Sequence, residues 1–459
     1  MKQWVNSLAF VLVTAAIFAT NTSAARADLR IEVLTRGPIH EAFAQPVTFD
    51  EGAGFAITRQ PPAPLEEMIP EQKPEGNHVL WIPGYWNWDT DRSDFIWISG
   101  CWRAVPPNCS WIPGYWATSA GGYQWVAGFW SSADTEEIEY LPAPPATLEA
   151  GPQGASSSNN IWIPGCWVRQ EGRYAWRAGF WEAGRANWVW VPSQYCYTPL
   201  GYVYVDGYWD YALKNRGVMF LPVYCPAELY GQAGFQFAPD IVFNIDVLSQ
   251  NLFCCPQRHH YYFGDYYGAD YAQQGYNPWC DVSVSFSWYD PLFVHAQWQH
   301  RDDHQWAANQ RTGYEQRRDN VALRPARTYA ALQVQIAGLP RKQRNQPQMA
   351  RPLKEAVAAK NAPFKFETVD AYTRTSTASQ AKDAQSYKVT RSQWESPKAA
   401  PAELPTQPRE ILSQKVKISR SSTRVNGPVS NKSLMPPPRP KHPTPDPNVQ
   451  PKEKKENGR

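Results

Sequence analysis

The sequence predicts an all-β fold of two four-stranded antiparallel meander modules, built from eight tryptophan-rich repeats of about 14 residues. A mixed tyrosine-rich region, short helices and a disordered tail are predicted to follow. Three observations support this: a short aromatic phrase recurs eight times, most copies start 14 residues apart, and polar loops separate them. Self-similarity at a fixed period is typical of repeat architectures, in which neighbouring units share one core. The phrases begin at Trp81, Trp97, Trp111, Trp125, Trp162, Trp176, Trp190 and Tyr204.

Each phrase is typical of one β-strand. Residues 123–130, for example, are rich in aromatic and β-branched side chains, which favour strands. Short loops such as residues 117–122, 168–173 and 182–187 join antiparallel neighbours rather than parallel ones. The sequence therefore predicts four consecutive strands, a linker, and four more strands.

The third position of the phrase alternates along the chain. It is Pro, Ser, Pro and Ala in the first four copies, and Pro, Ala, Pro and Asp in the second four. Proline cannot donate to a β-ladder, so it must lie at a bulge or where an N–H would face no partner. The glycine that usually follows permits a kink. The repeating unit is therefore predicted to be a hairpin of two unlike strands, about 28 residues long.

Composition divides the chain into segments. Lys2, an apolar run at 8–19 and the sequence Ala25-Arg26-Ala27 predict a signal peptide over residues 1–27. We therefore expect an exported protein of the periplasm, cell surface or extracellular space, with no transmembrane helix in the mature chain. The other predicted segments are an N-terminal segment with a Pro-rich linker at 28–76, repeat module 1 at 77–140, a linker at 141–160, repeat module 2 at 161–211, a Tyr/Cys-rich extension at 212–290, a polar helical segment at 291–345 and a basic disordered tail at 346–459.

Charge is distributed unevenly. Residues 341–459 contain 24 lysines and arginines against 10 acidic residues, a net charge of +14, whereas the first 340 residues have a net charge of −11. The proline-, serine- and lysine-rich end cannot bury enough apolar surface to offset its conformational entropy. We expect this tail to contact anionic envelope material or the acidic body, or simply to aid solubility. The tail lacks the interleaved aromatic residues that are typical of nucleic-acid-binding proteins. We also expect the body to fold without the tail.

Eight cysteines in an exported chain favour disulfides over zinc, because repeated C-x2-C pairs are missing. In a meander, the fifth position of one phrase would face the residue two before the next phrase. That rule pairs Tyr85 with Phe95, and it pairs Cys101 with Cys109. Directly opposed residues have Cβ atoms about 4.5–5.5 Å apart, close to the disulfide range. We therefore predict a disulfide between Cys101 and Cys109.

The W-x-x-G-x-W phrases, with a preceding tyrosine as in residues 123–130, resemble the YXWGXW (WXXGXW) repeat family of bacterial exported proteins. LPAPPATLEAGP, VYVDGYWDYALKNRGVMFLPVYC and RHHYYFGDYY look like segments of its planctomycete members. The resemblance covers roughly residues 61–332 and implies an envelope location, but no activity. Cys101 and Cys166 replace the usual aromatic residue of the phrase.

The tryptophans are either packing groups or a carbohydrate-binding face. Flat aromatic rings stack on sugars, but they also bury about 150–250 Å² each, and repeat units need shared cores. The leading expectation is a non-enzymatic scaffold or interaction protein whose cationic tail contacts an envelope polymer or another envelope protein. The alternative is a carbohydrate-binding module. Its candidate aromatic face comprises Trp86, Trp102, Trp116, Trp130, Trp167, Trp181 and Trp209.

Histidines and paired cysteines raise the question of a metal or catalytic site. The HExxH, C-x-x-C and G-x-S-x-G motifs are missing, so we predict no catalytic, metal or cofactor-binding residue. An enzyme with its site in residues 259–271 is the least favoured alternative. The residues considered are His259, His260, Asp265, His295, His300, His304, Cys254 and Cys255.

Overall fold

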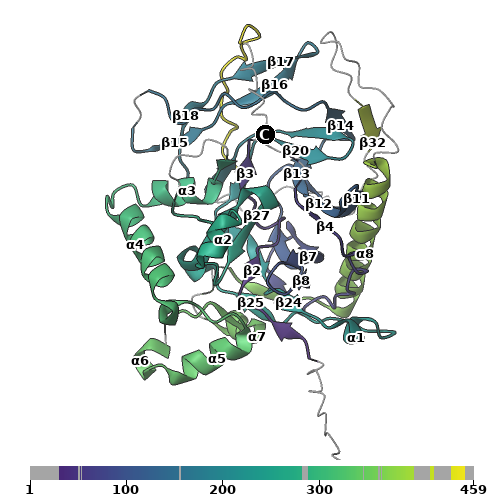
Figure 1. Cartoon of the computed structure of the whole chain (residues 1–459), viewed down its shortest axis with the longest axis vertical. Coiled ribbons are helices and arrows are strands. Elements are labelled where there is room, and N and C mark those ends of the chain that lie inside the picture. Colours follow the sequence, from purple (N-terminus) through teal and green to yellow (C-terminus); the bar gives the residue numbers. More distant parts are fainter. Residues whose placement is uncertain are drawn as a thin grey trace, which may run out of the picture.

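The computed structural model describes residues 30–49, 52, 54–154, 157–281, 288–344, 346–359, 362, 364–396, 414–417 and 436–449. The predicted signal peptide lies outside these residues, as does much of the predicted tail. The described chain forms many small antiparallel sheets, with helices along two sides (Figure 1).

The eight phrases form four bent hairpins. In hairpin 1, β6 pairs with β9 and β7 pairs with β8, and the third and fourth positions of both phrases interrupt the ladder. Hairpins 2 to 4 repeat this pattern: successive phrases pair as hairpins, but each phrase forms two short strands rather than the single strand predicted. The strands are β6 (Val79–Ile82), β7 (Tyr85–Asp89), β8 (Asp94–Ile98) and β9 (Cys101–Ala104); β10 (Cys109–Ile112), β11 (Tyr115–Ser119), β12 (Gly122–Val126) and β13 (Phe129–Ser132); β15 (Asn160–Ile163), β16 (Cys166–Gln170), β17 (Arg173–Arg177) and β18 (Phe180–Ala183); β19 (Trp188–Val191), β20 (Gln194–Thr198), β21 (Gly201–Val205) and β22 (Tyr208–Tyr211).

The two predicted four-stranded meanders are not formed. β9 pairs with β6 and with β23 (Gly217–Met219), and β8 pairs with β7 and with β24 (Val223–Tyr224). β18 and β19 belong to separate hairpins, so residues 182–187 do not close a hairpin, whereas residues 117–122 and 168–173 contain hairpin turns. The bend inside each hairpin interrupts a continuous ladder. Four hairpin strands (β8, β9, β12 and β21) also pair with strands from elsewhere in the chain, whereas, among the described strands, the outer strands of hairpins 2, 3 and 4 pair only with each other.

The predicted strand register is also wrong. Tyr85 lies opposite Ile98 rather than Phe95, and Trp86 lies opposite Trp97. In every hairpin the first aromatic residue of one phrase faces the last aromatic residue of the partner phrase. The pairing is therefore symmetric about the bend, and most of the facing rings meet edge to face.

The register change removes the argument for the predicted disulfide. Cys101 lies opposite Ile82 and Met219, while Cys109 lies opposite Ser132. All eight cysteines are buried, and none of them forms a disulfide in this structure. The Cys101–Cys109 bond stays a prediction that no longer has geometric support.

The other strands are short and pair antiparallel. They are β1 (Glu32–Val33), β2 (Gly37–Pro38), β3 (Val47–Thr48), β4 (Ala56–Ile57), β5 (Gln72–Pro74), β14 (Glu137–Leu141), β25 (Ile241–Phe243), β26 (Leu252–Cys255), β27 (His260–Phe263), β28 (Asn277–Pro278), β29 (Trp288–Tyr289), β30 (Ala350–Pro352), β31 (Phe366–Thr368) and β32 (Gln414–Lys417). The helices are η1 (Leu213–Asn215), α1 (Ala227–Tyr230), η2 (Ile245–Asn251), η3 (Pro256–Arg258), α2 (Ala269–Gln273), α3 (Pro291–Gln299), α4 (Trp306–Asp319), η4 (Val321–Leu323), α5 (Tyr329–Gly338), α6 (Arg341–Arg344), α7 (Leu353–Ala358) and α8 (Ala371–Trp394).

Helices α3, α4, α5 and α6 lie within 291–345, the segment predicted to be polar and helical. Among the helices that the structure describes, none combines the length and apolar composition needed to cross a membrane.

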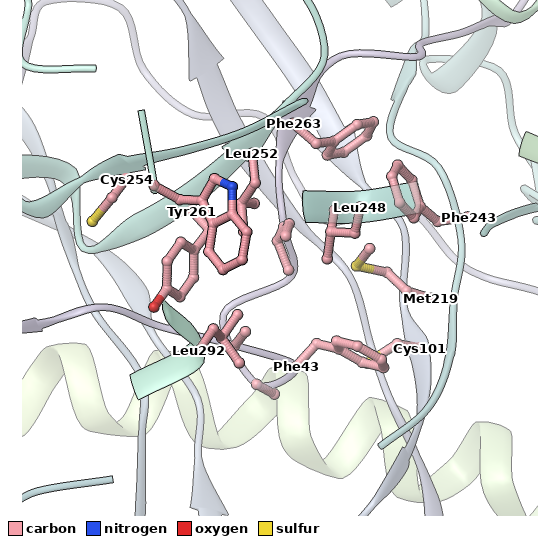
Figure 2. Close-up of a cluster of buried hydrophobic side chains, with 14 of the residues drawn as sticks. Phe43, Cys101, Met219, Phe243, Leu248, Leu252, Cys254, Tyr261, Phe263 and Leu292 are labelled. Carbon is pink, nitrogen blue, oxygen red and sulfur yellow. The ribbon is translucent and has the colours of Figure 1, made fainter. Parts of the chain in front are cut away.

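The N-terminal segment, predicted to precede the repeats, runs through the core. Residues 34–44 are all buried, and Phe43 is completely covered. Figure 2 shows Phe43 in one cluster with Cys101, Met219 and Phe243, which come from hairpin 1 and the Tyr/Cys-rich extension. The core therefore joins segments that composition alone assigned to different regions.

The described residues between 346 and 396 are folded, which corrects the prediction of a disordered tail beginning at 346. Helix α8 lies beside hairpin 2 (Figure 1). Its Arg391 is completely buried and donates to Glu395 and to the carbonyl of Pro113, 2.7 and 2.9 Å away. Glu395 also accepts the hydroxyl of Tyr115. The helix is held by buried polar side chains and small residues, which composition does not reveal, so the body is not independent of residues beyond 341.

Candidate functional site

The last aromatic residue of the phrase contacts a backbone carbonyl of another segment. The indole Nε1 of Trp86 donates to the carbonyl of Ala63 at 2.8 Å, and that of Trp167 donates to Ala146 at 2.9 Å. Trp116, Trp130, Trp181 and Trp209 make the same kind of bond, to Trp86, Ala42, Gln153 and Pro438 respectively. Six of the seven tryptophans in the predicted binding face therefore bind the chain itself.

Burial agrees with that role. Trp86, Trp102, Trp130, Trp167 and Trp209 are each no more than 4% exposed, whereas Trp116 and Trp181 are half-buried. Such tryptophans cannot form a row of exposed coplanar rings. Of the seven, only Trp116 and Trp181 have substantial ring surface available to a ligand.

The first aromatic residue of each phrase explains the glycine at the fourth position. Trp81 lies over Gly100, where an added Cβ would be 2.5 Å from its Cζ2 atom and 2.7 Å from the Ile82 carbonyl oxygen. Trp111 covers Gly128 with the same 2.5 Å separation. Real Cβ atoms do not approach neighbouring atoms so closely. Glycine is therefore required at the bend because the partner strand's ring occupies the space of a side chain.

A glutamate carboxylate binds the bend of each of the first three hairpins; Glu41 is buried, whereas Glu67 and Glu149 are half-buried. At hairpin 1, Glu67 accepts the N–H groups of Gly84 and Gly100 at 3.0 and 2.8 Å, and the indole of Trp97 at 2.8 Å.

Glu41 binds Gly114, Gly128 and Trp125 in hairpin 2. In hairpin 3, Glu149 binds Gly165 and Trp162. The bends need an external acceptor because the N–H groups there have left the ladder.

Hairpin 4 departs from the others in two coupled positions. Ser193 replaces the glycine of the first phrase, and Tyr204 replaces the tryptophan of the second. The serine hydroxyl and Asp206 accept from the N–H of Gly207, at 3.0 and 2.9 Å, in place of an external glutamate. The bend of hairpin 4 thus has a serine in place of glycine where the ring over the bend belongs to a tyrosine instead of a tryptophan.

Helix α8 places a lysine beside two of these carboxylates. Lys388 donates to the carbonyl of Gly84 at 3.2 Å, and burial lowers its pKa to about 8 while Glu41 and Glu67 oppose that shift. Burial raises the pKa of both glutamates, and the N–H groups that they accept oppose the rise. The helix therefore contacts the bend of hairpin 1 through Lys388, whose charge is stabilised by the carboxylates of Glu41 and Glu67.

An aromatic cleft of about 910 Å³ lies between hairpin 3, helix α3 and the start of helix α4. Its half-buried rings are Trp181, Trp288, Trp298 and Trp306. A cleft of this size, with aromatic walls and a few polar groups, is typical of a small-ligand site. Its polar lining includes Asp290, Gln297, His300, Arg301, Asp303 and His304.

Asp290 is the most distinctive polar group of this aromatic cleft. It is 1% exposed, and its Oδ1 atom accepts the hydroxyl of Tyr261 and the N–H of Phe293. Its Oδ2 atom has no hydrogen-bond partner among the described residues, and burial raises its pKa to about 6. A bound hydroxyl group could satisfy this atom.

The histidines considered for a metal site are dispersed. His260 is buried and within 2.8 Å of the Tyr85 hydroxyl, and His295 is 3.0 Å from the carbonyl of Arg185. The ring of His300 stacks on Trp306 with centroids 4.8 Å apart. Within the described ranges, no three histidine, cysteine or acidic side chains come together to hold a metal ion. His259, with a left-handed backbone, and Asp265, 3.8 Å from Arg324, lie near the tyrosine-rich core.

Sequence reasoning missed Glu41, Glu67 and Glu149. Glu67 and Glu149 lie in the segments predicted as linkers, and each follows a leucine that comes after a Pro-Ala-Pro sequence. That shared pattern could have indicated a common role. Glu41 has no such signal, because the segment around it has no repeat.

Comparison with known proteins gives one result. The family model described as WXXGXW repeat (2 copies) matches residues 79–103, 111–130, 161–182 and 200–212. No curated protein and no solved structure matches the chain.

Proposed function

The chain belongs to the WXXGXW repeat family, and we propose that it is a non-enzymatic, exported interaction scaffold of the cell envelope or extracellular space. One observation carries this proposal. The repeated tryptophans and glycines build the framework: the rings pair across each hairpin, cover the bends, and bind carbonyl groups of other segments. The signal-like sequence at residues 1–27 supports export.

The cationic end of the chain is the proposed contact with anionic envelope material. Three tail cations already pair with acidic groups of the body: Arg374 with Glu71, Lys382 with Glu66 and Arg439 with Asp206. Residues 397–459 nevertheless contain 13 lysines and arginines against 5 acidic residues. This excess supports binding to a polyanion beyond self-contact.

We expect full-length protein to be retained on an immobilised anionic polysaccharide at low salt and released near 1 M salt, where the Debye length is about 3 Å. Replacing Lys452, Lys454 and Lys455 with glutamine should weaken retention. The matched control replaces the exposed Arg341, Lys342 and Lys354, and should be retained like the wild type. Salt-independent retention, or equal loss in both variants, would contradict the proposal.

A second candidate function is carbohydrate binding in the aromatic cleft. The specific observation is the combination of half-buried tryptophan rings with the unpartnered Oδ2 atom of Asp290. Rings can stack on sugar faces while a buried carboxylate accepts a sugar hydroxyl. This differs from the original candidate face, of which only Trp181 lines the cleft.

If sugars bind there, a polysaccharide should quench tryptophan fluorescence in a saturable way, and Trp181→Ala should abolish the quenching. Trp116→Ala is the matched control, because Trp116 is also half-buried, pairs with a facing tryptophan and donates to a carbonyl. Circular dichroism checks that both variants fold. Equal quenching of wild type and Trp181→Ala would exclude this cleft.

A further inference from the structure

Residues 436–449 lie against hairpins 3 and 4. In Figure 1 they form the yellow segment beside β17. Seven of these 14 residues are proline. Proline has no backbone N–H and a fixed φ, so such a segment offers carbonyl acceptors and loses little entropy on binding.

Four contacts hold the segment. The indole of Trp209 donates to the carbonyl of Pro438 at 3.1 Å, and Arg439 pairs with Asp206 at 2.6 Å. The ring of His442 lies edge-on to Phe180 and tilted against Trp190, with centroids 5.2 and 6.0 Å apart. Finally, Trp176 and Asp446 exchange two backbone hydrogen bonds, of 3.3 and 2.9 Å.

The tryptophan-to-carbonyl contact recurs on other hairpins. Trp86 and Trp167 donate to Ala63 and Ala146, which also lie in proline-rich segments. Those two segments each continue into a glutamate that binds a hairpin bend, so they are integral to the fold of the hairpins. Residues 436–449 are different: they supply no such group, and most of their side chains are exposed or half-buried.

We propose that the face of hairpins 3 and 4 bounded by Trp176, Phe180, Trp190, Asp206 and Trp209 is a binding site for an extended, proline-rich, cationic peptide. The occupant is the chain's own segment 436–449, bound as a separable ligand. The indole of Trp209 donates to a peptide carbonyl, and Phe180 and Trp190 pack against a histidine ring. The carboxylate of Asp206 pairs with an arginine. This inference goes beyond the scaffold proposal and does not depend on carbohydrate binding.

The test uses full-length protein and a fluorescently labelled synthetic peptide of residues 436–449. In the variant Arg439→Glu with His442→Ala, the attached segment should bind weakly and leave the site open. We expect this variant to bind the peptide at least ten times more tightly than wild type does. In the wild type, the attached segment competes at an effective concentration on the order of millimolar.

The matched control is Lys441→Glu with Thr444→Ala, which makes the same change of charge and also truncates one side chain to alanine, at two exposed positions of the same segment. It should bind the peptide as weakly as wild type. Adding Asp206→Asn to the open variant should weaken binding about two- to fivefold, the usual range for an exposed ion pair. If the open variant fails a thermal-denaturation check, Arg439→Glu alone replaces it. No binding to the open variant, or equal binding to all variants, would overturn the proposal.

Peptide binding should also weaken as pH falls. Burial lowers the pKa of His442 to about 4, helped by Arg177 and Arg439 and opposed by Asp206. The bound form therefore carries fewer protons than the free form between pH 6.5 and 4, so acid favours release across that window. The open variant should bind the peptide several times more weakly at pH 5.5 than at pH 7.5. A peptide with His442→Phe should lose this dependence, and an unchanged pH profile would count against the histidine contact.

Discussion

Glu41→Ala is expected to destabilise the protein by about 3 kcal/mol or more, because each buried donor left without an acceptor costs about 1–3 kcal/mol. Three donors lose their partner: the N–H groups of Gly114 and Gly128, and the indole of Trp125. Lys388 also loses one of its two nearby anions. The alanine variant no longer has to bury the Glu41 carboxylate, and the removal of this desolvation cost offsets part of the lost stability.

Glu41→Gln should give a smaller loss, because the amide keeps the shape but has only one acceptor oxygen. Denaturant unfolding, followed by tryptophan fluorescence, measures both changes. The control is Glu137→Gln on an exposed strand position, expected to lie within about 0.5 kcal/mol of wild type. Glu41→Ala unfolding at the wild-type denaturant midpoint would show that the carboxylate does not hold the bend.

Gly128→Ala should cost about 3 kcal/mol or more, beyond the usual 1–3 kcal/mol of an overpacked core. The added methyl group would lie 2.5 Å from Trp111 Cζ2 and 2.7 Å from both the Gly114 nitrogen and the Ile112 carbonyl oxygen. Two of those atoms belong to the backbone and cannot turn away.

Gly338→Ala is the matched control. Gly338 ends helix α5, and an added Cβ there meets no atom within 4 Å, so its stability should equal or slightly exceed that of wild type. Thermal unfolding of both variants distinguishes a local steric conflict from a general effect of replacing glycine. Equal stability of the two variants would contradict the packing of Trp111 over the bend.

The hairpin unit was predictable because its evidence is local. Alternation of proline at the third position indicated unlike strands, and the fourth-position glycine indicated a kink. The register was not predictable from the same pattern. A meander and a bent hairpin have the same 14-residue sequence period. They differ in which residues face each other, as the pairing of Trp81 with Trp102 and of Trp86 with Trp97 in hairpin 1 shows.

The candidate aromatic face was predicted by residue type, but exposure depends on long-range packing. The rings of Trp86 and Trp209 are covered by segments 23 and 229 residues away in sequence. Likewise, composition assigned Glu67 to a linker and Arg391 to a disordered tail, although Glu67 binds a hairpin bend and Arg391 is completely buried. Isolated polar residues that satisfy a distant bend leave no periodic signal.

A double-mutant cycle between Gly165→Ser and Trp176→Tyr tests most directly whether the repeat is defined by a ring over a bend. Hairpin 4 naturally combines Ser193 with Tyr204 at the equivalent positions. In hairpin 3, a Cβ on Gly165 would lie 2.6 Å from Trp176 Cζ2, so the serine alone should be strongly destabilising. The tyrosine should recover part of that loss, giving a coupling free energy of at least about 1 kcal/mol. Additive losses, within about 0.5 kcal/mol, would mean that ring and glycine do not share the same space, which would contradict this account of the fold.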